Sequence, residues 1–294
     1  MISRIPDYAM NRRSLADLAG IKEQMDRSRA QLSSGKRILR PSDDPEGAAR
    51  ALQFQAQLDR STSYVSNAQS ALDEMNVTDG LLQNTSSSLR AARDLVIQHG
   101  NGALDSTGRK AIADQMRGLR DELVGIANSQ YRGIQVFSGT ASPGASFDGT
   151  YTYQGNAGVR ERSIGEGVHL TVNVAGDAVF GNGGSSMFAD LDAIIARIES
   201  GDTSNIAADL VTLDTHLEHT LSAAVTIGAR TSQATSAVDR LSAAKIDIAR
   251  ALSDTVDTDI ATATTDLQLQ QVAYQVTLQT LANLIKPSLL DFLR

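Results

Sequence analysis

Two histidines and a glutamate stand close together in the second half of the chain. His216 and His219 flank Glu218 in the run HLEH. Two histidines three residues apart on a helix can chelate a metal, but the metalloprotease pattern needs a spacing of four with glutamate directly after the first histidine. No third ligand stands nearby in the sequence. We therefore expect a solvated helix face here, with metal binding by the two histidines as the less favoured alternative.

An acidic cluster, Asp43, Asp44 and Glu46, is bracketed by Pro41 and Pro45. The spacing of a calcium-binding EF-hand loop is absent. Asp44 instead has the features of a helix N-cap, because a proline at the first helical position and an acidic residue in the first turn follow it. The cluster therefore predicts the start of a helix rather than a cation site.

The remaining candidate motif is glycine-rich. The run GNGG at residues 181–184 lacks the lysine and hydroxyl residue of a phosphate-binding loop and leads into two serines, so a linker is expected. No serine–histidine–aspartate arrangement is suggested by the sequence. We expect a protein that is not an enzyme and that has no catalytic residues, cofactor or metal site.

Composition narrows the class of protein. The 294 residues carry a net charge of −7, which disfavours a nucleic-acid partner or an anionic membrane surface. There is no cysteine, which excludes disulfides and zinc–thiolate sites. No cleavable signal peptide or membrane span is expected, since the first twenty residues are rich in charge and no apolar run is long enough. Aromatic residues make up only 4%, which suits long thin helices better than a compact enzyme.

Both ends of the chain carry apolar residues at helical spacing. These candidate interface residues are Leu18, Ile21, Met25 and Leu32 near the N-terminus and Ile260, Leu267, Tyr274, Leu281 and Leu284 near the C-terminus. A lone helix cannot bury such a stripe. We expect the ends to pair as antiparallel helices, or to pack against copies of themselves, and so to serve assembly.

The middle of the chain predicts further helices and one exception. Helices are expected over residues 45–99, 107–128, 187–200, 205–225, 231–255 and 257–286. Between them, residues 139–184 hold nearly half of the glycines, and Val168, Leu170, Val172 and Val174 alternate with polar residues as in a half-buried strand. Further strands are expected at residues 150–153 and 159–164. The fold class is thus mainly α, with long antiparallel helices and a small inserted β module.

This reading gives three regions. Residues 1–42 and 257–294 would form a terminal coiled-coil assembly domain, residues 43–135 and 185–256 a bundle of long helices, and residues 136–184 a small β-rich insert. Polar residues interrupt the apolar heptads at Ser61, Asp79, Ser86, Gln270 and Thr277. They are either solvent-exposed or buried to fix the register of pairing.

Several segments resemble a known family. QLSSGKRI at residues 31–38 and PSDDPEGA at residues 41–48 resemble the N-terminal signature of bacterial flagellins. LRAARDL at residues 89–95 is similar to the later part of the long flagellin helix, and residues 264–294 resemble the flagellin tail. Where flagellins tend to show Phe-Asn-Gly, this chain has YRGIQVFSGT at residues 131–140, which resembles the flagellin-like hook-associated proteins of the hook–filament junction.

The resemblance implies a function that composition and spacing alone do not. It implies a structural adaptor of the bacterial flagellum that self-associates in a ring through its terminal helices, with a hook-side hook-associated protein and flagellin as partners. It also implies secretion through the flagellar type III apparatus to the extracellular flagellum, with an export chaperone on the C-terminal helix. The alternatives are flagellin proper, the filament subunit, and more distantly a coiled-coil signalling protein.

Overall fold

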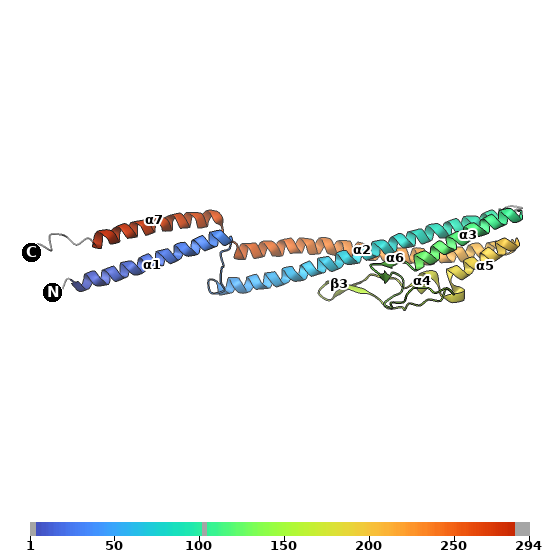
Figure 1. The fold of residues 1–294 in the computed structure, drawn as a ribbon, viewed down its shortest axis with the longest axis horizontal. Helices are drawn as coiled ribbons and strands as arrows, with labels where there is room; N and C mark the ends of the chain where they lie inside the picture. The colour runs from blue at the N-terminus through green and yellow to red at the C-terminus, as the bar shows by residue number, and fades with distance from the viewer. Residues whose placement is uncertain (1–3, 102–104, 286–294) are drawn as a thin grey trace, which may run out of the picture. The chain divides into compact units, whose positions relative to one another are not determined.

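The computed structural model describes residues 4–101 and 105–285, with side-chain surroundings for residues 12–101 and 105–282. Long helices dominate this part of the chain (Figure 1). They are α1 (Arg4–Ser34), α2 (Pro45–Asn101), α3 (Ser106–Ala127), α5 (Met187–Ser200), α6 (Ile206–Val256) and α7 (Ile260–Ile285). The shorter elements are β1 (Gln130–Tyr131), β2 (Ile134–Gln135), β3 (Glu161–Gly165), β4 (Val168–Thr171), α4 (Gly176–Phe180) and the 3₁₀ helix η1 (Gly183–Ser185). The prediction of a mainly α fold with a small β module is confirmed.

The chain divides into two compact units. The terminal unit comprises residues 1–60 and 245–294, and the central unit comprises residues 61–244. This division follows the expectation that the two ends belong together. The finer division into three regions stays a prediction.

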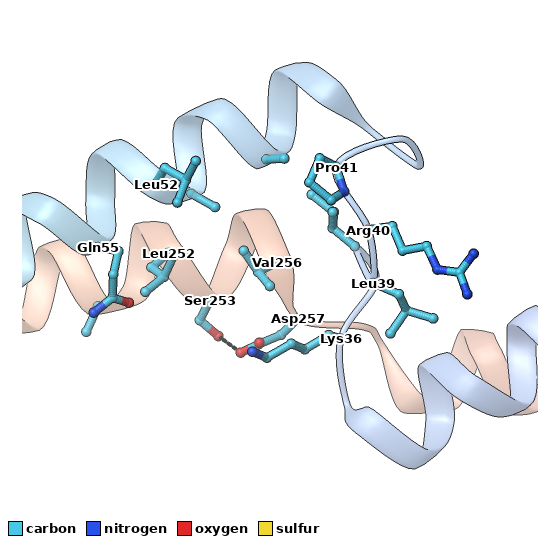
Figure 2. A pocket seen from close by; sticks show the side chains of 14 residues that line it. Lys36, Leu39, Arg40, Pro41, Leu52, Gln55, Leu252, Ser253, Val256 and Asp257 are labelled. Carbon is cyan, nitrogen blue, oxygen red and sulfur yellow. Dashed lines mark hydrogen bonds between the residues drawn. The ribbon is translucent and has the colours of Figure 1, made fainter.

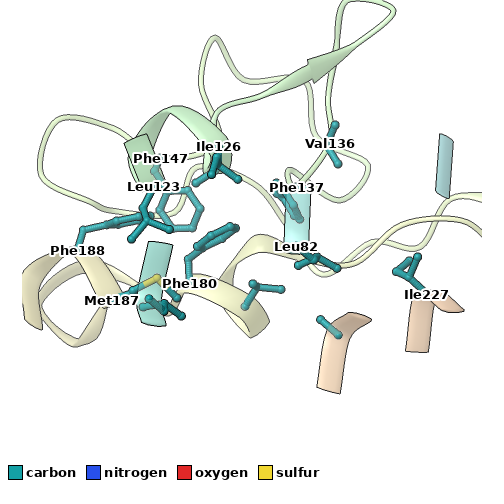
Figure 3. Close-up of a cluster of buried hydrophobic side chains, with 14 of the residues drawn as sticks. Leu82, Leu123, Ile126, Val136, Phe137, Phe147, Phe180, Met187, Phe188 and Ile227 are labelled. Carbon is teal, nitrogen blue, oxygen red and sulfur yellow. The ribbon is translucent and has the colours of Figure 1, made fainter. Parts of the chain in front are cut away.

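Phenylalanines form the centre of the central unit's core. Phe137, Phe147, Phe180 and Phe188 are all buried, although they come from loops, α4 and α5. The rings of Phe137 and Phe180 meet edge to face with centroids 5.1 Å apart, an arrangement that aromatic pairs prefer. Figure 3 shows these rings beside Leu123 of α3 and Met187 of α5. The insert is therefore packed into the helical core rather than attached to its surface.

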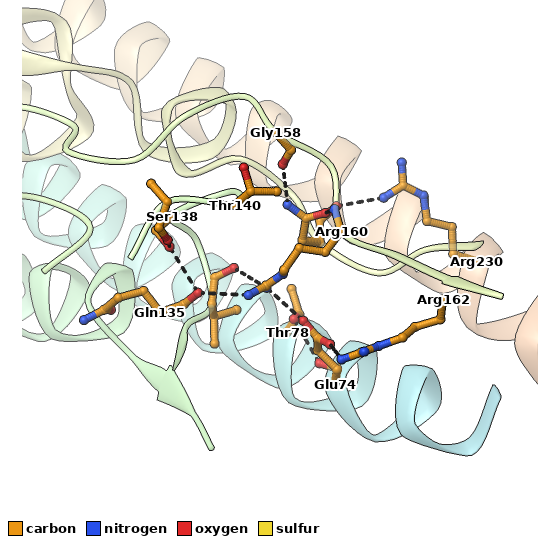
Figure 4. A network of polar contacts seen from close by, with 12 residues as sticks. Glu74, Thr78, Gln135, Ser138, Thr140, Gly158, Arg160, Arg162 and Arg230 are labelled. Carbon is orange, nitrogen blue, oxygen red and sulfur yellow. Dashed lines mark hydrogen bonds and ion pairs between the residues drawn. The ribbon is translucent and has the colours of Figure 1, made fainter. Parts of the chain in front are cut away.

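A charged network fastens the insert to α2 (Figure 4). The buried carboxylate of Glu74 forms an ion pair with Arg160 at 2.8 Å, and Arg162 lies 3.6 Å from its other oxygen. Arg160 also donates to the backbone carbonyl of Val136 at 3.2 Å. A buried carboxylate is costly unless it is paired and hydrogen-bonded. Glu74 therefore ties the β3–β4 hairpin and the start of the insert to one turn of α2.

The β elements are two separate antiparallel hairpins, β1–β2 and β3–β4. The expected strands near residues 159–164 and 168–174 correspond to β3 and β4. The strand expected at residues 150–153 is wrong, because Asp148 organises a turn there by accepting from the backbone N–H groups of Thr150 and Thr152 at 2.8 and 2.9 Å. Carboxylates that bond their own backbone two residues on are typical of turns, so alternation of threonine and tyrosine was misleading here.

The expected break between two helices near residues 225–231 is also wrong, since α6 is continuous from Ile206 to Val256. Ala223, Ile227, Ala234 and Ala237 are buried along it at helical spacing. The apolar stripe therefore runs straight through the segment, and Gly228 is accommodated in the helix.

Candidate assembly interface

The helices at the two ends of the chain pack side by side as an antiparallel pair (Figure 1). Ser28 of α1 donates to the side-chain oxygen of Gln270 of α7 at 3.0 Å, across 242 residues of sequence. Beyond the end of α1, Lys36 and Asp257 form an antiparallel backbone bridge. The buried Ser28 thus fixes how α1 and α7 align, which supports the register role proposed for Gln270 over simple exposure.

Most of the candidate interface residues lie on the face that α1 and α7 share. Met25 and Leu281 are buried there together with Ala263. The remaining half-buried candidates are Leu18, Ile21, Leu32, Leu267 and Tyr274. Their apolar surface is therefore covered first within the chain itself. Contacts of these residues with another subunit stay a prediction.

Two candidates stand apart from this face. Ile260 is 64% exposed, because it is the first residue of α7 and precedes the first buried position, Ala263. The side chain of Leu284 and the end of the last helix, expected at residue 286, lie outside the described residues.

Local chemistry sets where these helices begin and end. Gly35 follows α1 with a φ of 71°, and its N–H bonds the carbonyl of Gln31 at 2.8 Å, as in a glycine C-cap. Asp44 caps α2 as predicted, since its carboxylate accepts from the N–H of Gly47 at 2.9 Å. That bond lowers the pKa of Asp44 below its ordinary value. Asp259 caps α7 by accepting from the N–H of Ala261 at 2.9 Å, so this helix begins at Ile260 rather than at the expected residue 257.

Arg37 connects the two breaks in the helices of the terminal unit. Its backbone N–H bonds the carbonyl of Val256 at 2.7 Å. Its guanidinium donates to the carbonyl of Thr255 at 2.9 Å and to the carboxylate of Asp44 at 3.2 Å. The end of α6 and the start of α2 are thereby held together beside the α1–α7 pair. Sequence reasoning did not single out Arg37, because its partners on α6 lie more than 200 residues away.

The exposed surface of α7 carries an apolar stripe and is uncharged over most of its length. Leu269, Val272 and Val276 are 64%, 58% and 55% exposed, and their helical angles place them nearly opposite the face that meets α1. We call these three residues the outer stripe. No charged residue occurs from Leu267 to Ile285, whereas the exposed surface of α1 carries charges of both signs. Contiguous exposed apolar surface is typical of interaction sites, so contact of the outer stripe with another protein is a prediction.

His216 corrects the expectation of a solvated face for the HLEH run. It is buried on α6, and its Nε2 lies 2.7 Å from a carboxylate oxygen of Asp190 on α5. His219 remains exposed. Within the described residues there is no group of three or more acidic or histidine side chains placed to hold a metal ion. His216 thus connects two helices of the central unit.

Membrane insertion finds no support in the helices. Over residues 4–101 and 105–285, none of them combines the length and apolar character that crossing a bilayer requires.

Family models and known proteins match both ends of the chain and much of the sequence between them. The model of the bacterial flagellin N-terminal helical region matches residues 5–142, and the model of the C-terminal helical region matches residues 190–293. The flagellar hook-associated protein 3 of Salmonella typhimurium is 24% identical over 99% of this chain and 100% of its own length. A flagellar filament core protein of Treponema maltophilum is 27% identical over 86% of this chain and 85% of its own.

A solved structure shows the same arrangement. The putative flagellar hook-associated protein from Vibrio parahaemolyticus is 25% identical, with a TM-score of 0.69 over 73% of this chain and all of that one. The fold of 73% of the present chain thus has a counterpart in a protein described as flagellar.

Proposed function

Because the chain belongs to the bacterial flagellin family, we propose that it is the adaptor that joins the hook of the flagellum to the filament. It is a structural component of the flagellum, as the other members reported above are. The observation that supports the adaptor role best is the alignment with hook-associated protein 3 over the full length of both chains. The similarity therefore includes the β insert, and not only the regions at residues 5–142 and 190–293 that match the flagellin models.

The terminal unit supplies the means of assembly. The α1–α7 pair leaves the outer stripe of Leu269, Val272 and Val276 exposed and without charge. Subunits that bury this stripe in contacts with neighbouring copies would form a ring on the hook, with the hook-side hook-associated protein on one side and flagellin on the other. The free energy gained would grow with apolar area at about 25 cal/mol per Å².

The same stripe needs protection before assembly. We propose that a flagellar export chaperone covers α7 in the cell and that the protein then leaves through the flagellar type III apparatus. An unprotected apolar stripe would promote aggregation. Co-expression with the chaperone should keep wild-type protein monodisperse, and Val272→Asp should weaken the complex, whereas the exposed Gln275→Ala should not.

The experiment that tests the adaptor role is removal of the protein from a flagellated cell. Electron microscopy should show hooks without filaments, and flagellin should accumulate in the culture medium unpolymerised. Filaments of normal number attached to hooks in such cells would contradict the proposal.

Flagellin proper is the second candidate, since the similarity to the Treponema filament core protein also covers most of both chains. The two functions differ in copy number. A junction ring needs few subunits per flagellum, whereas a filament that grows by repeated addition needs many. Quantitative mass spectrometry of purified flagella separates the two, because an adaptor should be scarce relative to the main flagellin.

A further inference from the structure

The terminal unit contains a groove where the helices break. It has a volume of about 430 Å³ and lies between the start of α2, the end of α6 and the connecting segment after α1 (Figure 2). Its lining includes Leu39, Pro41, Leu52, Leu252 and Val256. We call it the break groove. Leu52 is 72% exposed although it lies on the wall of this groove.

The break groove is large enough for several aliphatic side chains. A cavity of roughly 150 Å³ lined by such residues holds one benzene molecule, so this one has room for two or three side chains of valine or leucine size. No side chain of the described residues occupies the break groove. Lys36 and Arg40 stand among the lining residues, and neither makes an ion pair within the described part of the chain.

A surface that matches this groove is present on the same chain. The outer stripe offers one leucine and two valines at spacings of three and four, which form a ridge along α7. Asp266 lies one turn before Leu269 on the exposed side, and it makes no ion pair in the described residues. The ridge therefore has a negative charge at one end, and the groove is positive on balance, since Lys36 and Arg40 outnumber Asp257 among its charged lining residues.

We propose that the outer stripe of one subunit inserts into the break groove of a second copy of this chain, with Asp266 of the first facing Lys36 of the second. This inference rests on the proposed function, because an adaptor ring requires contacts between neighbouring copies. A contact between two different surfaces repeats from copy to copy and closes into a ring or continues as a helix. A stripe that met only its own copy would stop at a dimer.

The groove cannot be filled by the stripe of its own chain. Val272 lies twelve residues into α7, about 18 Å from the start of that helix. Leu52 lies in the second turn of α2, across the break from which α7 leads away (Figure 2). A disulfide needs Cα atoms about 4.4–6.8 Å apart, so cysteines at these two positions could bridge only between copies.

The chain contains no cysteine, which makes cross-linking a clean test. A strain that lacks the native protein would produce Leu52→Cys/Val272→Cys, and isolated flagella would be oxidised mildly. We expect a ladder of dimers, trimers and larger products. Leu52→Cys and Val272→Cys expressed separately should give none, and their co-expression should give a dimer. The matched control Leu52→Cys/Val225→Cys places the second thiol on a valine that is 73% exposed in the central unit, and it should cross-link at least several-fold less.

Two outcomes would overturn the proposal. Dimers from Val272→Cys alone, as abundant as those from the double variant, would mean that the stripe meets its own counterpart. Attached filaments without any ladder would mean that another surface fills the groove, while the adaptor role would still stand. Should the cysteine variants assemble poorly, charge reversal gives the second measurement. Lys36→Glu should reduce filament number several-fold, and adding Asp266→Lys should restore it; failure to restore would count against the pairing.

Discussion

The central and terminal units bury their apolar side chains in different ways. In the central unit four phenylalanines meet at one core, with leucines and methionines of α2, α3 and α5 around them. In the described part of the terminal unit, only Met25, Ala263 and Leu281 among the hydrophobic residues are buried. Larger apolar residues such as Leu269 and Leu52 stay exposed there. One unit is therefore complete within the chain, and the other has apolar surface left for partners.

The difference has a thermodynamic consequence. Ordering a residue costs about 1–2 kcal/mol of backbone entropy, which apolar burial must offset. In the central unit, the buried core offsets this entropy. The described terminal helices meet along one narrow contact between α1 and α7, which we call the seam and which contains the hydrogen bond between Ser28 and Gln270. We infer that the terminal unit gains most of its stability from assembly.

The largest effect is expected from a change in the seam that leaves the central unit intact. Leu281→Ala removes one of its few buried side chains, and such a truncation in a packed core costs about 2–5 kcal/mol. The loss recurs at every subunit of a ring. We expect most filaments to be lost while the variant is still secreted, as measured by filament counts and by protein in the medium.

The matched control for Leu281→Ala is Gln275→Ala, an exposed residue of the same helix. It should leave filament numbers unchanged. Normal filaments with Leu281→Ala would mean that the α1–α7 seam does not matter in the assembled flagellum, and the contrast between the two units would fail.

A core change in the central unit should lower the stability of the isolated monomer, unlike the seam change, whose effect is on assembly. Phe180→Ala removes a ring that stands between Phe137 and Phe188, and it should lower the free energy of unfolding by about 3–5 kcal/mol. Denaturant unfolding of the purified monomer measures this. The exposed Val225→Ala should change stability by less than about 0.5 kcal/mol. A loss below about 1 kcal/mol for Phe180→Ala would show that the aromatic core is not what stabilises this unit.

A smaller effect is expected where the insert is fastened to α2. Glu74→Gln removes the buried charge that faces Arg160 and leaves the guanidinium with only its carbonyl partners. Breaking one side of a buried pair is strongly destabilising, and we expect a loss of about 3 kcal/mol in the unfolding free energy. Arg162→Gln alters the longer, half-exposed contact and should cost less than about 1 kcal/mol. Equal losses for the two variants would contradict the assigned role of Glu74.

Much of this contrast could be predicted from the sequence, because it depends on local signals. The stripes that contain Met25 and Leu281 predicted the pairing of the ends, and Asp44 with Pro45 predicted the start of α2 to the residue. Helical periodicity and capping depend on residues a few positions apart, so both can be recognised in the sequence.

The interactions that sequence reasoning missed are those between distant segments. The pairing of His216 with Asp190 depends on how α5 and α6 pack, and the bonds of Arg37 to α6 depend on the closure of the whole chain. The exposure of Val272 could be foreseen only once the seam had assigned α7 an inner and an outer face. Spacing alone shows that a face is apolar, and it does not show which partner covers it.

The smallest effect concerns the pH dependence of the turn that replaced an expected strand. Hydrogen bonds from the Thr150 hydroxyl and from backbone N–H groups lower the pKa of Asp148 below its ordinary value of 3.8. The folded state therefore binds this proton less readily than the unfolded state, so the ionised carboxylate stabilises the fold above pH 3.8. That contribution disappears as the pH falls through the lower folded pKa. In Asp148→Asn the side-chain oxygen can still accept the turn bonds but no longer titrates. Chemical unfolding of the monomer between about pH 5 and pH 2 should therefore show a shallower acid loss than in wild type. An unchanged slope would mean that the acid sensitivity of the central unit arises from other carboxylates, such as Asp202, whose pKa is lowered by the hydroxyl of Ser204.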